Sequence, residues 1–272
     1  MSKLFRGGIA LAALLAAPSA MAADLKAPLY KAPPPVYLSS WTGFYLGIGL
    51  GWREINNDWN TTATFFPGGA PFFFTTDPNP FFSNGAGRVS IYGGYNLQVA
   101  PTVVIGVEAD YGWADNHSTL ASIPGLGVQG FGSFTDVRGR WDGSVRGRAG
   151  YLITPMLLAY GTAGVAFQRV EETATCPADT TVCNPAFDTV TLSNASNRVG
   201  YTVGGGLEAM FGHFLARAEY RYANYGTFSF TAFPAVPNRS FGANADLITS
   251  THTVTVGLAY KFDGFGPVVA NY

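Results

Sequence analysis

Hydrophobic and polar residues alternate along most of this chain with a period of two. The clearest run covers residues 41–53. One face of it carries the larger apolar side chains Phe44, Leu46, Ile48, Leu50 and Trp52. The other face carries Gly43, Tyr45, Gly47, Gly49, Gly51 and Arg53. Strict alternation over this length predicts a β-strand about as long as a bilayer crossing. A helix is disfavoured because each interior glycine would cost about 1 kcal/mol relative to alanine.

The same alternation recurs seven more times, which predicts eight strands. The further runs are 87–97, 102–113, 137–151, 157–168, 198–211, 214–222 and 251–262. In the run 157–168 the pattern is ambiguous. We place its outward face at Leu157, Ala159, Ala163, Val165 and Phe167.

The connections between these runs alternate in length. Those near 98–101, 152–155 and 212–213 are short. Those at 54–85, 114–136, 171–197 and 226–248 are long and rich in Pro, Asn, Thr and Phe. Short periplasmic turns and long extracellular loops are typical of outer-membrane barrels. The pattern therefore predicts an all-β protein, an eight-stranded antiparallel transmembrane β-barrel, with both chain termini in the periplasm.

Charged side chains lie on the face opposite the apolar one, and we expect them to form a network in the lumen. The predicted members are Arg88, Glu108, Asp110, Arg140, Asp142, Arg146, Arg148, Arg198, Glu208, Arg217, Glu219, Arg221 and Lys261. A one-residue slip of the run 137–151 would turn two arginines toward lipid, at about 2–4 kcal/mol each near the midplane. An eight-stranded barrel is only wide enough for side chains, so these charges must pair. The inner glycines 47, 49 and 51 would make room for long arginines.

Composition supports a membrane barrel. Of 272 residues, 12% are charged, 15% are aromatic and 34 are glycine, and no apolar run of helix-spanning length occurs beyond the N-terminus. A soluble enzyme of this size carries more surface charge. The net charge of −1 gives no nucleic-acid signature. No motif indicates a cofactor or a metal; the glycines 204–206 are followed by neither a helix nor a GK pair.

The first residues have the features of an export signal. Lys3 and Arg6 precede a short apolar stretch, and Ala20-Met21-Ala22 predicts cleavage between Ala22 and Ala23. The alternative is an uncleaved anchor. We therefore expect a signal peptide at 1–22, a Pro-rich periplasmic leader at 23–40, the barrel at 41–262 and a C-terminal tail at 263–272.

Cys176 and Cys183 lie close together in a polar segment. Export would place them in an oxidising compartment, so we expect a loop-closing disulfide, with two free thiols as the alternative. Their spacing is not CxxC and no histidine lies nearby, so redox catalysis and zinc binding fit poorly.

The motifs resemble a known family. The segment SSWTGFYLGIGLGW after the Pro-rich leader is similar to the start of small outer-membrane β-barrel surface antigens of alphaproteobacteria. Supporting pieces, in order, are GGYN, GVEADY, RGRAGY, AEYRY and VTVGLAYKF. The resemblance implies surface exposure and a role in outer-membrane integrity, with porin or ligand-binding activity proposed for some members. One departure is that the chain continues past Phe262 to Tyr272, so either aromatic could be the assembly signal.

Three functions are compatible with the sequence. We favour a filled barrel with a structural and surface-interaction role. The alternatives are a narrow channel for small anions, based on the excess of inward positive charge, and a lipid-modifying enzyme. For the last, His117, His213 and His252 are candidates, and Ser250 could share a face with His252, but no acid completes a triad.

Expected partners are outer-membrane lipid and lipopolysaccharide, the barrel assembly machinery, and an extracellular ligand or host surface reached by the loops. The phenylalanines of the first long loop either form a contact site or fold over the barrel mouth. They are Phe65, Phe66, Phe72, Phe73, Phe74, Phe81 and Phe82.

Overall fold

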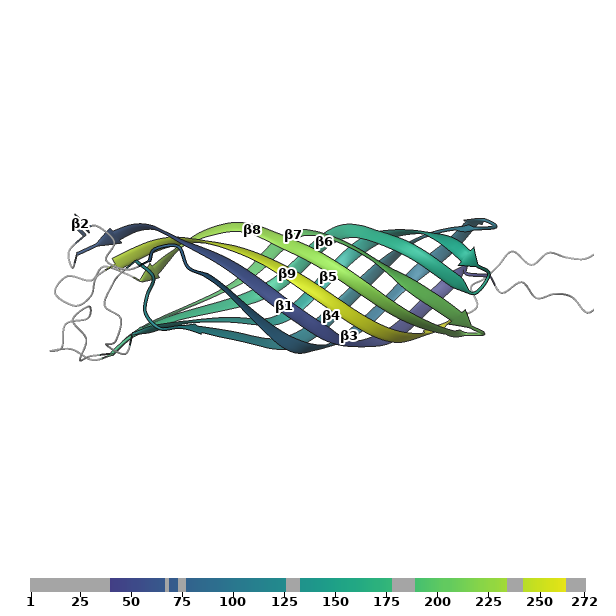
Figure 1. Cartoon of the computed structure of the whole chain (residues 1–272), viewed down its shortest axis with the longest axis horizontal. Helices are drawn as coiled ribbons and strands as arrows, with labels where there is room; N and C mark the ends of the chain where they lie inside the picture. Colours follow the sequence, from purple (N-terminus) through teal and green to yellow (C-terminus); the bar gives the residue numbers. More distant parts are fainter. Residues whose placement is uncertain are drawn as a thin grey trace, which may run out of the picture. The chain divides into compact units, whose positions relative to one another are not determined.

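The computed structural model describes residues 40–66, 69–72, 77–125, 133–177, 189–233 and 242–262. Its strands are β1 (Gly43–Phe65), β2 (Pro71–Phe72), β3 (Phe81–Ala100), β4 (Val103–Leu120), β5 (Phe134–Thr154), β6 (Leu157–Cys176), β7 (Val190–Phe211), β8 (Phe214–Phe233) and β9 (Gly242–Lys261). The eight long strands follow one another around a ring (Figure 1), and β1 pairs antiparallel with β9 to close it. The predicted eight-stranded barrel is confirmed. In the described ranges, no helix is long and apolar enough to cross a membrane.

The two ends of the barrel differ in their connections. At one end, tight turns at 101–102, 155–156 and 212–213 join consecutive strands. We call this the turn end, and the opposite end the loop end. Gly212 has a φ of 62°, a left-handed conformation that glycine adopts without strain. The turn end therefore matches the short connections predicted from the sequence.

An outward-facing band of apolar side chains surrounds the half of the barrel nearer the turn end. We call it the apolar belt; its most exposed members include Ile48, Val107, Val145, Val199 and Val256. Ile48 is 65% exposed. A continuous apolar surface of this kind requires lipid, because water-soluble proteins rarely expose patches of such extent. The outward face assigned to 157–168 is also confirmed, with Val165 and Phe167 exposed and Leu158 buried.

The strands are longer than the sequence predicted. Each long strand has 18 to 23 residues, whereas a tilted strand crosses a bilayer in about 9–11. Much of the segments predicted as long loops is therefore strand, and those strand ends were wrong. The reason is an inversion of the pattern beyond the apolar belt. On β1, Ile55 and Trp59 point inward, while Glu54 and Asn60 point outward. The alternation predicts strands from apolar residues that face outward, so it misses strand segments whose apolar residues face inward.

Candidate functional site: the charged barrel interior

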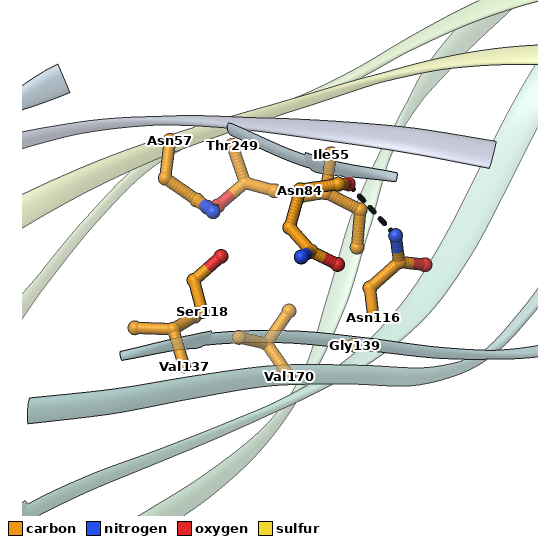
Figure 2. Close-up of a pocket in the computed structure, with 9 residues that line it drawn as sticks. All are labelled: Ile55, Asn57, Asn84, Asn116, Ser118, Val137, Gly139, Val170 and Thr249. Carbon is orange, nitrogen blue, oxygen red and sulfur yellow. Dashed lines mark hydrogen bonds between the residues drawn. The ribbon is translucent and has the colours of Figure 1, made fainter. Parts of the chain in front are cut away.

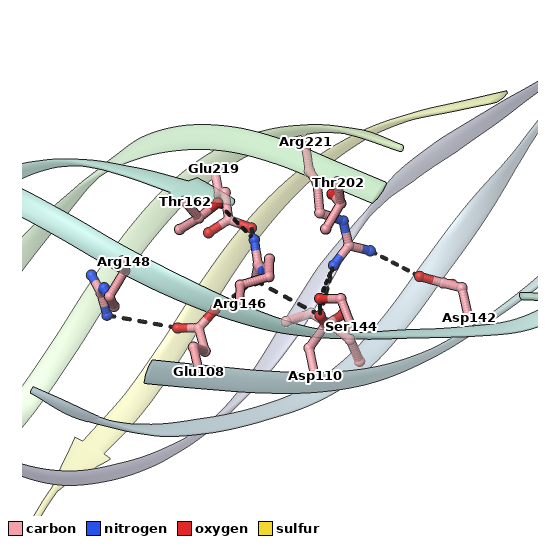
Figure 3. A network of polar contacts seen from close by, with 12 residues as sticks. Glu108, Asp110, Asp142, Ser144, Arg146, Arg148, Thr162, Thr202, Glu219 and Arg221 are labelled. Carbon is pink, nitrogen blue, oxygen red and sulfur yellow. Dashed lines mark hydrogen bonds and ion pairs between the residues drawn. The ribbon is translucent and has the colours of Figure 1, made fainter. Parts of the chain in front are cut away.

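Glu108 on β4 is the centre of one ion-pair cluster inside the barrel (Figure 3). Its Oε1 accepts from Nη2 of Arg146 at 2.5 Å, and its Oε2 accepts from Nη1 of Arg217 at 2.6 Å. The Tyr45 hydroxyl donates to the same Oε2 at 2.7 Å. Arg146 also donates to Glu219 at 2.7 Å. The side chains of Arg146 and Glu108 are 0% exposed, so their charges are balanced by buried partners and not by water.

Asp142 on β5 is the centre of a second cluster, nearer the loop end. Its carboxylate accepts from Arg53 at 2.6 Å and from Arg88 and Arg221 at 2.8 Å each. Asp110 on β4 accepts from Arg88 and Arg221 at 2.7 Å each. Figure 3 shows Arg221 reaching both carboxylates. Guanidinium groups have several donors in a rigid plane, so each can bridge two acids from different strands.

Toward the turn end, Arg148 continues the network. Its Nη2 donates to Glu208 at 3.3 Å, and its guanidinium lies 4.2 Å from the ring centre of Tyr160. Such cation–π contacts add to ion pairing where water is excluded. Lys261 on β9 is buried, and its Nζ donates to the carbonyl of Thr42 at 3.5 Å.

Toward the loop end, a separate pair joins β6 and β7. Arg198 donates from Nη2 to Oε1 of Glu172, and its guanidinium lies 4.2 Å from the ring centre of Phe228. Both members of the pair are buried. The interior of the barrel thus carries paired charges at several levels along its axis.

Arg140 does not belong to this network, and its predicted inward placement was wrong. Its side chain is 47% exposed and its Nε donates to Glu171 at 3.1 Å on the outer surface. The cause is a β-bulge in β5 between Gly139 and Asp142. A bulge adds a residue to one strand and reverses the facing of the residues beyond it. Asp142 therefore points inward, as predicted, and Arg140 points outward.

Two charged residues of the interior are missing from the predicted set. Arg53 has the parity of the inner glycines of β1, which was the available signal, and it contacts Asp142. Glu172 lies in a segment predicted as loop, so no face was assigned to it. The remaining twelve predicted side chains lie inside the barrel.

The inner glycines have a different role from the predicted one. A Cβ at Gly47 would lie 2.7 Å from the Tyr92 ring, and one at Gly49 would lie 2.8 Å from Ser90 Oγ. A glycine that does accommodate an arginine is Gly112 on β4, where a Cβ would lie 2.2 Å from Nη2 of Arg88. These glycines therefore make room for neighbours on the adjacent strand.

Apolar side chains close both ends of the charged interior. At the turn end the apolar plug consists of Trp41, Val104, Leu152, Leu158, Met210 and Leu215. At the loop end the apolar cap consists of Trp59, Ile123, Ala174, Ala243, Ala245 and Leu247. Trp41 donates from Nε1 to the Pro155 carbonyl at 3.1 Å, and Thr61 donates to the Pro124 carbonyl at 2.8 Å, so hydrogen bonds fix both closures.

A small cavity lies between the charged layer and the apolar cap (Figure 2). Its polar lining includes Asn57, Asn84, Asn116 and Thr249, and Asn116 donates to the Asn84 carbonyl at 2.8 Å. The cavity volume is about 10 Å³. A space of this size holds about one water molecule.

Several predicted features lie outside the described residues. These are the signal peptide with its cleavage between Ala22 and Ala23, the Pro-rich leader apart from Ser40, Cys183 of the expected disulfide, Phe73 and Phe74 of the first loop, and the tail to Tyr272. They stay predictions. Among the described residues, no group of acidic, histidine or cysteine side chains could hold a metal ion.

Comparison with known proteins identifies relatives of this barrel. A 31 kDa outer-membrane immunogenic protein of Brucella melitensis biotype 1 is 28% identical over 93% of this chain and 98% of its own length. A 25 kDa outer-membrane immunogenic protein of Brucella abortus biovar 1 is 31% identical over 90% of this chain and 91% of its own. A 22 kDa outer membrane protein of Rhizobium leguminosarum bv. viciae is 29% identical over 82% of this chain and 79% of its own length.

Among solved structures, the outer membrane protein OprG from Pseudomonas aeruginosa matches 82% of this chain and 97% of its own, with 12% identity and a TM-score of 0.49. The family model described as "Outer membrane protein beta-barrel domain" matches residues 9–262. The apolar belt and the closed ring of strands agree with that family match. The chain is a member of the outer membrane protein beta-barrel domain family and resides in the outer membrane.

Proposed function

We propose that this protein is a closed barrel that anchors surface loops and contributes to the structure of the outer membrane, and that it does not conduct ions. The observation that carries the proposal is the filled interior. Paired charges occupy the middle, and the apolar plug and apolar cap lie on either side of them. An ion crossing this path would have to separate buried ion pairs, which costs several kcal/mol each.

The small cavity supports the same proposal. It has room for about one water molecule, and the arginines of the neighbouring Asp142 cluster are held by two or more acceptors each. The interior has more arginines than acids, which is the feature that favoured an anion channel. Carbonyl and hydroxyl acceptors bind some of the arginine donors that the acids leave over. Arg53, for example, also donates to the carbonyl of Gly139 at 2.8 Å.

We place the loop end outside the cell and the turn end in the periplasm, as is usual for outer-membrane barrels. The names of the Brucella relatives describe immunogenic proteins, which supports surface exposure of the corresponding end here. The proposed partners are lipopolysaccharide around the apolar belt, the assembly machinery during insertion, and an extracellular ligand at the loop end. Exposed Phe66 and Phe81 lie at the loop end and support the last of these.

Catalysis is not part of the proposal. The ring of His252 bonds to the Tyr220 hydroxyl at 2.7 Å and lies against Tyr222. His117 bonds to Asp136 at 3.0 Å, on strands β4 and β5 and not on the strands of His252. The hydroxyl that contacts this histidine is that of Thr119. The relatives' names describe outer-membrane proteins and mention no enzymatic activity.

Planar-bilayer recording tests the proposal. The purified mature chain, with folding verified by its heat-dependent gel migration, should give no stable conductance steps, while a large-pore barrel reconstituted in parallel should give them. Stable steps from the wild type whose anion preference falls in Arg146→Ala would overturn the closed barrel in favour of an anion channel.

A further inference from the structure

The basic side chains of the described residues are divided unequally between the two faces of the barrel. Those of the interior are buried: Arg53, Arg88, Arg146, Arg148, Arg198, Arg217, Arg221 and Lys261. Within the described ranges only Arg138, Arg140 and Arg169 point outward. All three lie on the neighbouring strands β5 and β6. We call them the arginine patch.

The strand register places the arginine patch at one level. Arg138 is the Cα partner of Glu171, and Gly139 is the partner of Val170, so Arg169 lies opposite the bulge that carries Arg140. The bulge is what brings Arg140 to the outer surface. Without it, the alternation of β5 would direct Arg140 into the lumen, and the patch would lose the guanidinium at its centre.

Glu171 organises the patch. One carboxylate oxygen accepts from Nε of Arg140 and the other from Nε of Arg169, each at 3.1 Å. Among the described residues, the Nη groups of these two arginines and the side chain of Arg138 form no hydrogen bond or ion pair. The neighbouring Asp136 accepts from Thr119 at 2.6 Å and bonds to His117 at 3.0 Å, and Asp115 forms no ion pair with the patch. Outward-facing guanidinium donors thus remain available for another anion.

The depth of the patch indicates what that anion is. Trp141 follows Arg140 directly in the chain and stacks on Tyr111 at 5.8 Å, and Phe167 precedes Arg169 by two residues on the same face. Aromatic residues of this kind mark the level of the lipid headgroups. The loop-end leaflet faces outward in the proposed orientation. Its lipids present phosphate groups at that level, and planar guanidinium forks match phosphate geometry.

We propose that the arginine patch binds the phosphate groups of a phosphorylated glycolipid of the outer leaflet, with the acyl chains lying on the adjacent apolar belt. The site would fix one lipid on the β5–β6 side of the barrel, because the outward face of the other described strands carries no Lys or Arg. The inference rests on the outward orientation of the loop end in the proposed function. It does not depend on whether the lumen conducts.

Native mass spectrometry of the folded, full mature chain tests the proposal. The probes are lipid A carrying both phosphates and the same lipid A with its phosphates removed. The wild type should prefer the phosphorylated form by about tenfold or more, the effect of one charge-assisted hydrogen bond to a phosphate. The triple variant Arg138→Gln/Arg140→Gln/Arg169→Gln should lose this preference.

Two further variants sharpen the test. Ser250→Gln changes an outward residue on β9 without touching charge, and it should bind as the wild type does. Glu171→Gln removes the competing carboxylate and should bind phosphorylated lipid A as tightly or more tightly. Heat-dependent gel migration verifies that every variant is folded, and the same preparations can be recorded for conductance, so the two proposals can fail separately.

Two binding results would overturn the site. One is equal binding of the two lipids by the wild type, and the other is an undiminished preference in the triple variant. Competition separates the source of the phosphate: millimolar inorganic phosphate should leave lipid A bound, because it lacks the acyl contacts. If inorganic phosphate displaced phosphorylated lipid A, and the protein bound lipid A no more tightly than inorganic phosphate, a lipid site would be contradicted.

Discussion

The half of the barrel within the apolar belt and the half toward the loop end are built from the same strands with opposite polarity. On β9, Val254 and Val256 face outward, with threonines inside. Two leucines of this strand have opposite orientations. Leu258 faces outward in the apolar belt, whereas Leu247, eleven residues earlier in the chain, faces inward in the apolar cap. The strand continues without interruption between the two halves.

The solvent around each half decides which face is apolar. In the apolar belt, lipid surrounds the barrel, so apolar side chains face outward and charges are placed inside as pairs. Toward the loop end, water surrounds the barrel, and at the apolar cap the ordinary arrangement of a soluble β-protein returns, with apolar side chains inside and polar ones outside. Substitutions in each half, compared by their effect on the free energy of unfolding, measure how far the two halves differ.

The largest effect is expected from Glu108→Gln in the charged interior. It leaves Arg146 and Arg217 without their shared carboxylate in a site closed to water. Removing one partner of a buried ion pair costs about 3–5 kcal/mol. The free energy of unfolding, from urea titration in lipid vesicles, should fall by this amount.

The matched control is Glu171→Gln, the same change on the outer surface. Its pairs with Arg140 and Arg169 are partly exposed, and such pairs contribute about 0–1 kcal/mol. Equal losses from the two variants would mean that the interior is hydrated rather than closed.

The sequence predicted the apolar half well and the loop-end half poorly, for a physical reason. Alternation with large apolar residues outward is unambiguous where lipid is the solvent, so strand number, order and facing could be predicted from it, as could most lumen charges. Toward the loop end the apolar face carries small residues such as Ala243 and Ala245, which resemble loop composition. The bulge that displaces Arg140 has no signature in a single sequence, because the alternation is regular on both sides of it.

The next effect in size is expected from Leu247→Ala in the apolar cap. Leu247 is 0% exposed, and truncating a buried leucine costs about 2–5 kcal/mol in lost contacts and cavity formation. The adjacent Ile248 is 39% exposed on the outer face, so Ile248→Ala should cost less than about 1 kcal/mol. Urea titration of both variants tests the inversion directly. A larger loss from Ile248→Ala would place the apolar face outside at this level.

The smallest of the three effects, but the most direct test of the comparison, comes from placing the same charge on the outer face of β1 at two levels. Ile48→Arg puts a guanidinium into the apolar belt, where a lipid-facing arginine costs about 2–4 kcal/mol. Asn60→Arg puts it on an exposed position toward the loop end, where surface substitutions change stability by about 0.5 kcal/mol or less. Both positions share the parity of β1, so strand geometry cannot explain a difference. If the two variants unfolded at the same urea concentration, the polarity reversal along β1 would not reflect a change from lipid to water.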